Sequence, residues 1–481
     1  MSNLSSKDLR TLTHDIDRIA NENALFAPQS LEDLKSIDLK AASYLSREIR
    51  LSGNRRFLLT DSGYTALQAI VTRLDGANLS DGLADYSDLF TATKKVFEDC
   101  LSKGQRPEDG AELAKLIGQT LEQTIASHRF VARLYGVELK DIDSVRLGTF
   151  RIVQPTAEWI RDLGGDHSHE NVALLLERTG HQLWLTGEVT GTLRIARAKF
   201  QAGAQLATGV LTVLAAALYQ YGAHAFRIGI AMTPEESYGE ASFLTWTDKN
   251  PSPSITFQYA KSQPLIVDPD MRTRLEHSPL CTRAFTILDS DNRNDLEDAI
   301  VHALYWYSDA HRDLLTEMRL LKYWSCVETF FSSKTKTTQA VTQGLAACLV
   351  FGEFRLPAAG EYTTFKRRLT KLYDQRSRAT HEAEYGHVSD RDAADFSQWV
   401  SWMLLNMITL SEHGYTTVDS VKAWARAIDA EHPPPDEPVP GANPPAPISE
   451  QPSTPTPSAV PTLRVRLQRV WSALVEVFRP S

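Results

Sequence analysis

Just over half of the prolines in this chain lie in one segment near its C-terminal end, residues 431–462. That segment holds twelve of the 23 prolines, together with serine, threonine and glycine. Because such a sequence is extended, partly polyproline-like and unable to bury apolar surface, we expect a disordered linker here. The linker separates residues 1–430 from a short C-terminal segment, residues 463–481.

The C-terminal segment has the periodicity of an amphipathic helix. Its apolar residues share one helical face: Leu463, Leu467, Val470, Trp471, Leu474 and Phe478. Arg464, Arg466 and Arg469 flank that face. The sequence leaves two roles open for helix 463–478: docking on a protein, either this chain or a partner, or lying on a membrane surface.

The composition of the chain limits the classes of protein to which it can belong. The chain has 481 residues, of which 42% are hydrophobic and 23% charged, and its formal net charge is −9. Any contact with nucleic acid must therefore come from a local basic patch. The four cysteines form no CxxC pair, which argues against a disulfide framework and a thiolate zinc site. The N-terminus lacks the apolar core of a signal peptide, so we expect a cytoplasmic protein without cofactor or metal.

The pattern of residues before the linker predicts a mainly α protein with an α+β middle region. Residues 1–140 read as a helical N-terminal region, including a helical segment at 108–135. Residues 141–290 read as an α+β domain. Strand-like alternation occurs at 145–153, 182–186, 226–232, 242–246 and 255–259, with helix-like stretches at 169–179 and 192–221. The most apolar stretch, 206–218, is too short to span a bilayer and predicts a buried helix.

Residues 291–430 predict an all-helical domain. Six helical segments stand out: 294–312, 314–332, 335–351, 361–382, 389–412 and 417–429. Asp291 or Asn294 can cap the first of these segments, Ser333 or Thr335 the third, and Ser389 the fifth. The fourth segment is strongly basic against the acidic background of the chain.

The basic residues of this fourth segment are candidates for phosphate contacts. Between Phe365 and His381 it has six cations against one acid, Asp374. These cations are Lys366, Arg367, Arg368, Lys371, Arg376 and Arg378. The plainer alternative, which the charges alone favour, is a solvated basic helix without a binding role. The apolar residues on the same helix predict that its other side is buried.

Arg376, Ser377 and His381 together carry the chemistry of phosphodiester cleavage. An imidazole accepts or donates a proton near neutral pH, and a guanidinium donates two parallel hydrogen bonds to phosphate oxygens. On a straight helix, residues five positions apart point about 140° away from each other. Arg376 and His381 therefore converge only if the helix ends near His381 or if two chains meet there.

The run from Leu372 to His381, LYDQRSRATH, resembles the Rx4–6H signature of HEPN domains, and in particular the Apea-like group. The upstream run from Tyr323 to Phe330, YWSCVETF, is similar to an earlier helix of that group, which has an aromatic residue followed by Glu. The resemblance covers about residues 290–415. One departure is Glu382, where family members often have Gly after the His.

The resemblance implies a helical bundle that forms a homodimer and acts as a metal-independent endoribonuclease in antiviral or abortive-infection defence, as a toxin would. Arg376 and His381 match the catalytic pair, and Ser377, Glu328 and Tyr373 match supporting positions. The remaining region is then a sensor or regulator. The alternative is a non-catalytic RNA- or nucleotide-binding scaffold that works through protein partners. In a plainer interpretation, Glu328 pairs with an arginine such as Arg376, and Trp324 and Tyr373 are core residues.

Overall fold

A computed structural model describes the following residues of the chain: 4–21, 24–26, 47–51, 55–162, 173, 177, 182–218, 226–231, 240–247, 250–259, 264–313, 315–335, 337–356, 359–381 and 388–432. For residues 240–247, 250–259, 359 and 379–381 it describes the backbone alone. The expected linker 431–462, apart from its first two residues, and helix 463–478 lie outside the described residues, as does most of the helix expected at 169–179. The described part is mainly helical with several small sheets.

Contacts divide the chain into two compact units, one of residues 1–130 and 187–202 and the other of residues 131–186 and 203–481. In the first unit, helices pack around a core that includes Leu12, Ile16 and Ile70. These helices are α1 (Ser6–Ile19), α4 (Asp61–Gly76), α5 (Tyr86–Ser102) and α6 (Gly110–Glu122).

The N-terminal region is less helical than the sequence predicts. A small antiparallel sheet has the order β1-β3-β2, with β1 (Leu25–Phe26), β2 (Glu48–Leu51) and β3 (Arg55–Leu59). The expected helix at 108–135 is wrong beyond Glu122, because residues 126–135 form strand β4 (Ala126–Tyr135). The partners of β4 in its sheet, β8 and β9, come much later in the chain, since β4 ends at Tyr135 and β8 begins at Leu183. Tertiary pairing of this kind overrides a local helical pattern.

The middle of the chain contains a five-stranded sheet of order β6-β7-β8-β4-β9. Its other strands are β6 (Ser144–Leu147), β7 (Phe150–Val153), β8 (Leu183–Gly191) and β9 (Gly229–Ile230). Further pairs are β5 (Val137–Leu139) with β12 (Leu265–Val267), and β10 (Glu240–Thr247) with β11 (Asn250–Tyr259). The single strand expected at 145–153 is instead a hairpin, because Gly148 has a φ of 59° and turns the chain. Of the strand expected at 226–232, residues 226–231 are described, and only β9 forms among them.

Helix α9 (Leu193–Leu218) contains the apolar stretch 206–218, and residues such as Leu211 and Ala215 are fully buried, as predicted. In the described part of the chain, α9 alone has the length and composition of a membrane span, and 67% of its most apolar window is buried inside the protein. This is the burial of a core helix. Three further helices are α7 (Ala157–Asp162), α10 (Pro269–His277) and α11 (Pro279–Asp289).

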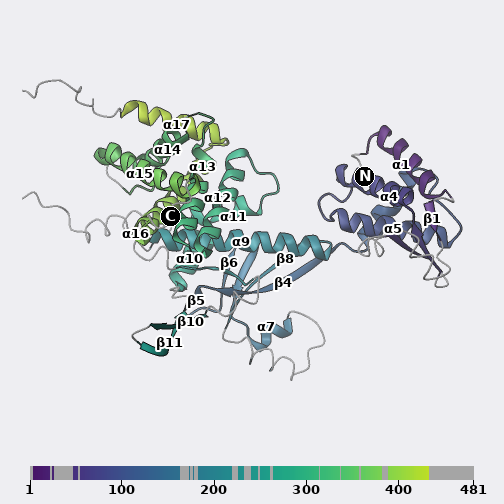
Figure 1. Ribbon diagram of the computed structural model, residues 1–481, viewed down its shortest axis with the longest axis horizontal. Helices are drawn as coiled ribbons and strands as arrows, with labels where there is room; N and C mark the ends of the chain where they lie inside the picture. The colour runs from purple at the N-terminus through teal and green to yellow at the C-terminus, as the bar shows by residue number, and fades with distance from the viewer. Residues whose placement is uncertain are drawn as a thin grey trace, which may run out of the picture. The chain divides into compact units, whose positions relative to one another are not determined.

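The prediction of six helices within residues 294–430 is confirmed in the described part of this range. The helices are α12 (Asp295–Arg312), α13 (Thr316–Phe331), α14 (Thr337–Phe351), α15 (Tyr362–His381), α16 (Asp390–Glu412) and α17 (Val418–Glu431). They form a bundle, drawn from teal α12 to yellow-green α17 in Figure 1. Asn294, one of the two candidates for the first cap, forms a capping box with Glu297, and Ser389 caps α16 as predicted.

Helix α16 is the centre of this bundle. Nearly all of its residues from Ala393 to Thr409 are buried. Buried Asn406 donates through Nδ2 to the carbonyl oxygens of Cys348, at 3.2 Å, and Phe354, at 3.0 Å. Its side-chain oxygen also accepts from the backbone N–H of Phe354 at 2.9 Å. This one side chain therefore fixes the turn after α14 against α16.

Candidate functional site

Arg376 of α15 is paired with Glu328 of α13. Its Nη2 atom lies 3.1 Å from Oε1 and 3.2 Å from Oε2 of the carboxylate. Both side chains are about one-fifth exposed, at 21% each. The Tyr373 hydroxyl donates to the same carboxylate at 2.8 Å. The plainer interpretation of Glu328, as the partner of Arg376, is thus present in the structure.

Aromatic residues hold this trio from the core side. The Trp324 ring is fully buried and meets the Tyr373 ring edge-on, with centroids 4.9 Å apart. The Arg376 guanidinium carbon lies 5.4 Å from the centre of the Tyr373 ring. Burial first, and then the hydrogen bond to Glu328, raise the pKa of Tyr373 to about 12. At neutral pH the phenol is therefore a proton donor to the carboxylate, and α13 and α15 are fixed to each other.

Helix α15 runs without interruption to His381, the last described residue before 388. Residues 382–387 lie outside the described part, so the helix end required for Arg376 and His381 to converge stays a prediction. On a regular helix, position 381 is turned about 140° from position 376, which faces α13. Ser377 is partly exposed between them. The side chain of His381, and the acidic residues that follow it, lie outside the described part.

The candidate phosphate-binding cations of α15 fall into two groups. Arg367, Lys371 and Arg378 are exposed and follow each other at helical spacing along one face. The other two make contacts within the bundle. Lys366 Nζ lies 2.7 Å from Asp429. Arg368 pairs with Asp395 at 2.7 Å and stacks on a tryptophan of α16. The exposed group is therefore the better candidate for contact with a polyanion.

Glu328→Ala is expected to lower the free energy of unfolding by about 1–3 kcal/mol, because it leaves the Tyr373 hydroxyl and the Arg376 guanidinium without their shared acceptor. Urea unfolding of the full chain measures the change. Glu353 is an exposed acid in the same bundle, and Glu353→Ala should stay within about 0.5 kcal/mol of the parent. Equal stabilities of the two variants would contradict a stabilising role for the trio.

A serine and a histidine that the sequence did not single out also meet in this bundle. His311 Nε2 lies 3.0 Å from Ser397 Oγ, and His311 Nδ1 lies 3.0 Å from the carbonyl of Phe226. Tyr307 donates to the Ser397 carbonyl at 3.0 Å. His311 is only 2% exposed, while Ser397 and Tyr307 are fully buried. Because substrate has no access to these atoms, the cluster satisfies buried polar groups and is not a nucleophile–base pair.

A cleft of about 1020 Å³ lies within the first unit. Its basic lining consists of Arg50, Lys94, Lys95, Arg194 and Arg197. Three of these cations are paired with carboxylates: Arg50 with Glu48, Lys95 with Asp99 and Arg194 with Asp85. Asp88 and Glu98 also line the cleft. The charges of this cleft are thus largely balanced. An anion meets less net positive charge there than at the exposed face of α15.

No protein-family model matches this chain, and no curated protein or solved structure matches it. In the part of the chain that the structure describes, no three His, Cys, Asp or Glu side chains gather closely enough to hold a metal ion.

Proposed function

We propose that the helical bundle of residues 291–430 is an endoribonuclease of the HEPN type, with His381 as general acid or base and Arg376 as phosphate clamp. The observation that carries this proposal is Arg376. Its guanidinium is held by the Glu328 carboxylate, which also accepts from the Tyr373 hydroxyl, and it lies five positions before His381 on α15. A guanidinium held in place before substrate arrives loses little freedom on binding phosphate.

The proposed reaction is transfer of the phosphoryl group to the neighbouring ribose hydroxyl. An imidazole takes the proton of the 2′-hydroxyl, and the 2′-oxygen forms a bond to phosphorus. The bond from phosphorus to the 5′-oxygen breaks, and that oxygen takes a proton. The products are a 2′,3′-cyclic phosphate and a 5′-hydroxyl. A homodimer would supply two histidines, one as base and one as acid, together with two arginines to balance the charge that develops on phosphate.

The test is incubation of the purified full chain with labelled single-stranded RNA in EDTA. We expect cleavage of the RNA and none of a DNA strand with the same sequence, because DNA lacks the attacking hydroxyl. Absence of RNA cleavage, or equal cleavage of the DNA, would contradict the proposal. Cytoplasmic localisation and action in antiviral defence belong to the same proposal, in which the region before residue 290 senses the trigger.

The exposed cations of α15 give a separate prediction. The triple variant Arg367→Ala, Lys371→Ala and Arg378→Ala should bind single-stranded RNA more weakly. The slope of log affinity against log salt should fall by about 2, since each phosphate contact contributes about 0.7. Fluorescence anisotropy at several salt concentrations measures it. Replacing Lys366 and Arg368 should change the slope less, because both pair with acids of the bundle; an equal change would contradict this division.

One observation favours the second candidate, a non-catalytic RNA- or nucleotide-binding scaffold. The carboxylate of Glu328 already compensates the charge of Arg376, so the arginine is explained by packing alone. This candidate predicts RNA binding through the exposed face of α15 without cleavage. Binding would then survive in Arg376→Ala and fail in the triple variant.

A further inference from the structure

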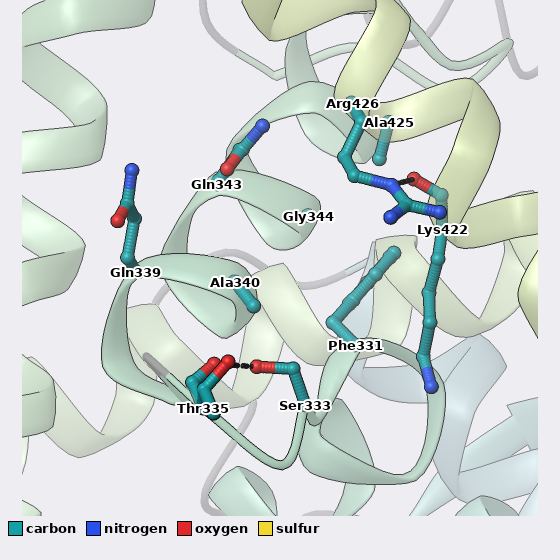
Figure 2. Close-up of a pocket in the computed structure, with 10 residues that line it drawn as sticks. All are labelled: Phe331, Ser333, Thr335, Gln339, Ala340, Gln343, Gly344, Lys422, Ala425 and Arg426. Atoms are coloured by element: carbon teal, nitrogen blue, oxygen red, sulfur yellow. Dashed lines mark hydrogen bonds between the residues drawn. The ribbon is translucent and has the colours of Figure 1, made fainter.

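A second pocket lies in the helical bundle, bounded by the end of α13, the first half of α14 and α17. Figure 2 shows its lining, and its volume is about 350 Å³. That volume lies within the range of small-molecule sites. None of the ten residues that line it is acidic.

Two cations come from α17, one turn apart. In Figure 2, Lys422 and Arg426 lie on the same side of the pocket. The Nε atom of Arg426 donates to the Lys422 carbonyl at 3.2 Å, which anchors the guanidinium beside the lysine. Lys422 forms an ion pair with Asp419, in which Nζ lies 3.8 Å from the carboxylate. The Asp419 side chain is 94% exposed. An exposed ion pair at this distance contributes little, so the side of the pocket that α17 forms keeps a net positive charge.

Neutral polar groups form the rest of the rim. Gln339 and Gln343 lie one turn apart on α14, across the pocket from Lys422 and Arg426 in Figure 2. Ser333 and Thr335 lie in the loop before α14, where the Ser333 hydroxyl donates to the Thr335 carbonyl. Amides and hydroxyls donate and accept hydrogen bonds without adding charge. They suit the polar edge of a ligand whose anionic group meets the cations.

The floor of the pocket is apolar and tightly packed. It is formed by Phe331, Ala340, Gly344 and Ala425. A Cβ atom at position 344 would come within 2.2 Å of the Phe331 ring, so only glycine lets α13 and α14 approach this closely. The floor therefore offers apolar surface to the uncharged body of a ligand.

We infer that this pocket binds a phosphorylated small molecule of mononucleotide size, with its phosphate on Lys422 and Arg426 and its less polar body over Phe331. Two cations with hydrogen-bond donors suit phosphate oxygens. The site uses none of the residues of the Arg376 trio. Its test is a binding measurement, so it stands or falls independently of RNA cleavage.

The test is calorimetric titration of the full chain with the four ribonucleoside 5′-monophosphates, and with adenosine and inorganic phosphate. We expect at least one monophosphate to bind at least tenfold more tightly than adenosine and than phosphate. Lys422→Ala with Arg426→Ala should weaken that binding by at least about tenfold. Arg391→Ala removes an exposed arginine of α16 that does not line the pocket and should leave the binding unchanged.

Three outcomes would overturn the inference. They are the absence of monophosphate binding at millimolar concentration, affinity unchanged in the double variant, and an equal loss in Arg391→Ala. Circular dichroism checks that the double variant is folded, as expected for side chains outside the core. As a second variant, Lys422→Glu reverses the charge and should abolish binding.

Discussion

His381→Ala is expected to lower the rate of RNA cleavage by about 10²–10⁴-fold, the contribution of a general acid or base. Arg376→Ala should cost about 10²–10³-fold, as loss of a charge-stabilising donor does. Both figures rest on the proposed reaction. Single-turnover cleavage of labelled RNA measures them, with the folded state of each variant checked by circular dichroism.

Matched controls separate chemistry from surface charge. His302 is an exposed histidine of α12, and Arg391 is an exposed arginine of α16. His302→Ala and Arg391→Ala should retain the parent rate. A parent-like rate in both His381→Ala and Arg376→Ala would show that the cleavage arises elsewhere.

The largest expected loss of stability follows from Trp324→Ala, at about 3–5 kcal/mol. The Trp324 ring is fully buried and contacts Tyr373 of α15 and Phe396 of α16, with centroids 4.9 Å and 4.3 Å away. Removing it leaves a cavity where three helices meet, and it removes the support under the Glu328 carboxylate. Urea unfolding gives the change.

Trp306 provides the comparison for Trp324. It lies on α12 in the same bundle but is 39% exposed. Trp306→Ala should cost at most about 2 kcal/mol, because 39% of its surface already faces water and its removal leaves no closed cavity. A loss for Trp324→Ala below that figure would mean that α13, α15 and α16 do not depend on this ring.

The helices of residues 294–430 were predictable because their signals are local. Apolar periodicity and caps such as Asn294 and Ser389 act within a few residues, and the bounds differ from those observed by two residues at most. Two missed helices, α10 and α11, also carry a local signal. Asp268 and Ser278 cap them, each followed by a proline in the first turn.

The strands were harder to predict because their partners are distant in sequence. Strand β3 pairs with both β1 and β2. These strands are too short to show a long alternation of apolar and polar residues. The residue pattern around them therefore predicts helix. Strand β4 is explained by its neighbours in the sheet and not by its own residues. The boundaries at 140 and 290 stay predictions.

The candidate site was predictable in its residues and in one contact, the pairing of Glu328 with Arg376. The spacing of Arg376 and His381, and Glu328 on an earlier helix, are visible in the sequence. The division of the α15 cations into an exposed row and two bundle contacts depends on acids of α16 and α17. The pocket between α13, α14 and α17 has no sequence signature, because its lining comes from three helices with ordinary composition.

The most direct test of the proposed reaction is the chemistry of the RNA ends after cleavage in EDTA. End-labelling and phosphatase treatment distinguish the possible products. We expect a 5′-hydroxyl on one fragment and a 2′,3′-cyclic phosphate on the other, with no cut where a single 2′-deoxynucleotide replaces the attacking ribose. Fragments with 5′-phosphate ends, a requirement for added divalent metal, or an uncut RNA would contradict the assignment of Arg376 and His381.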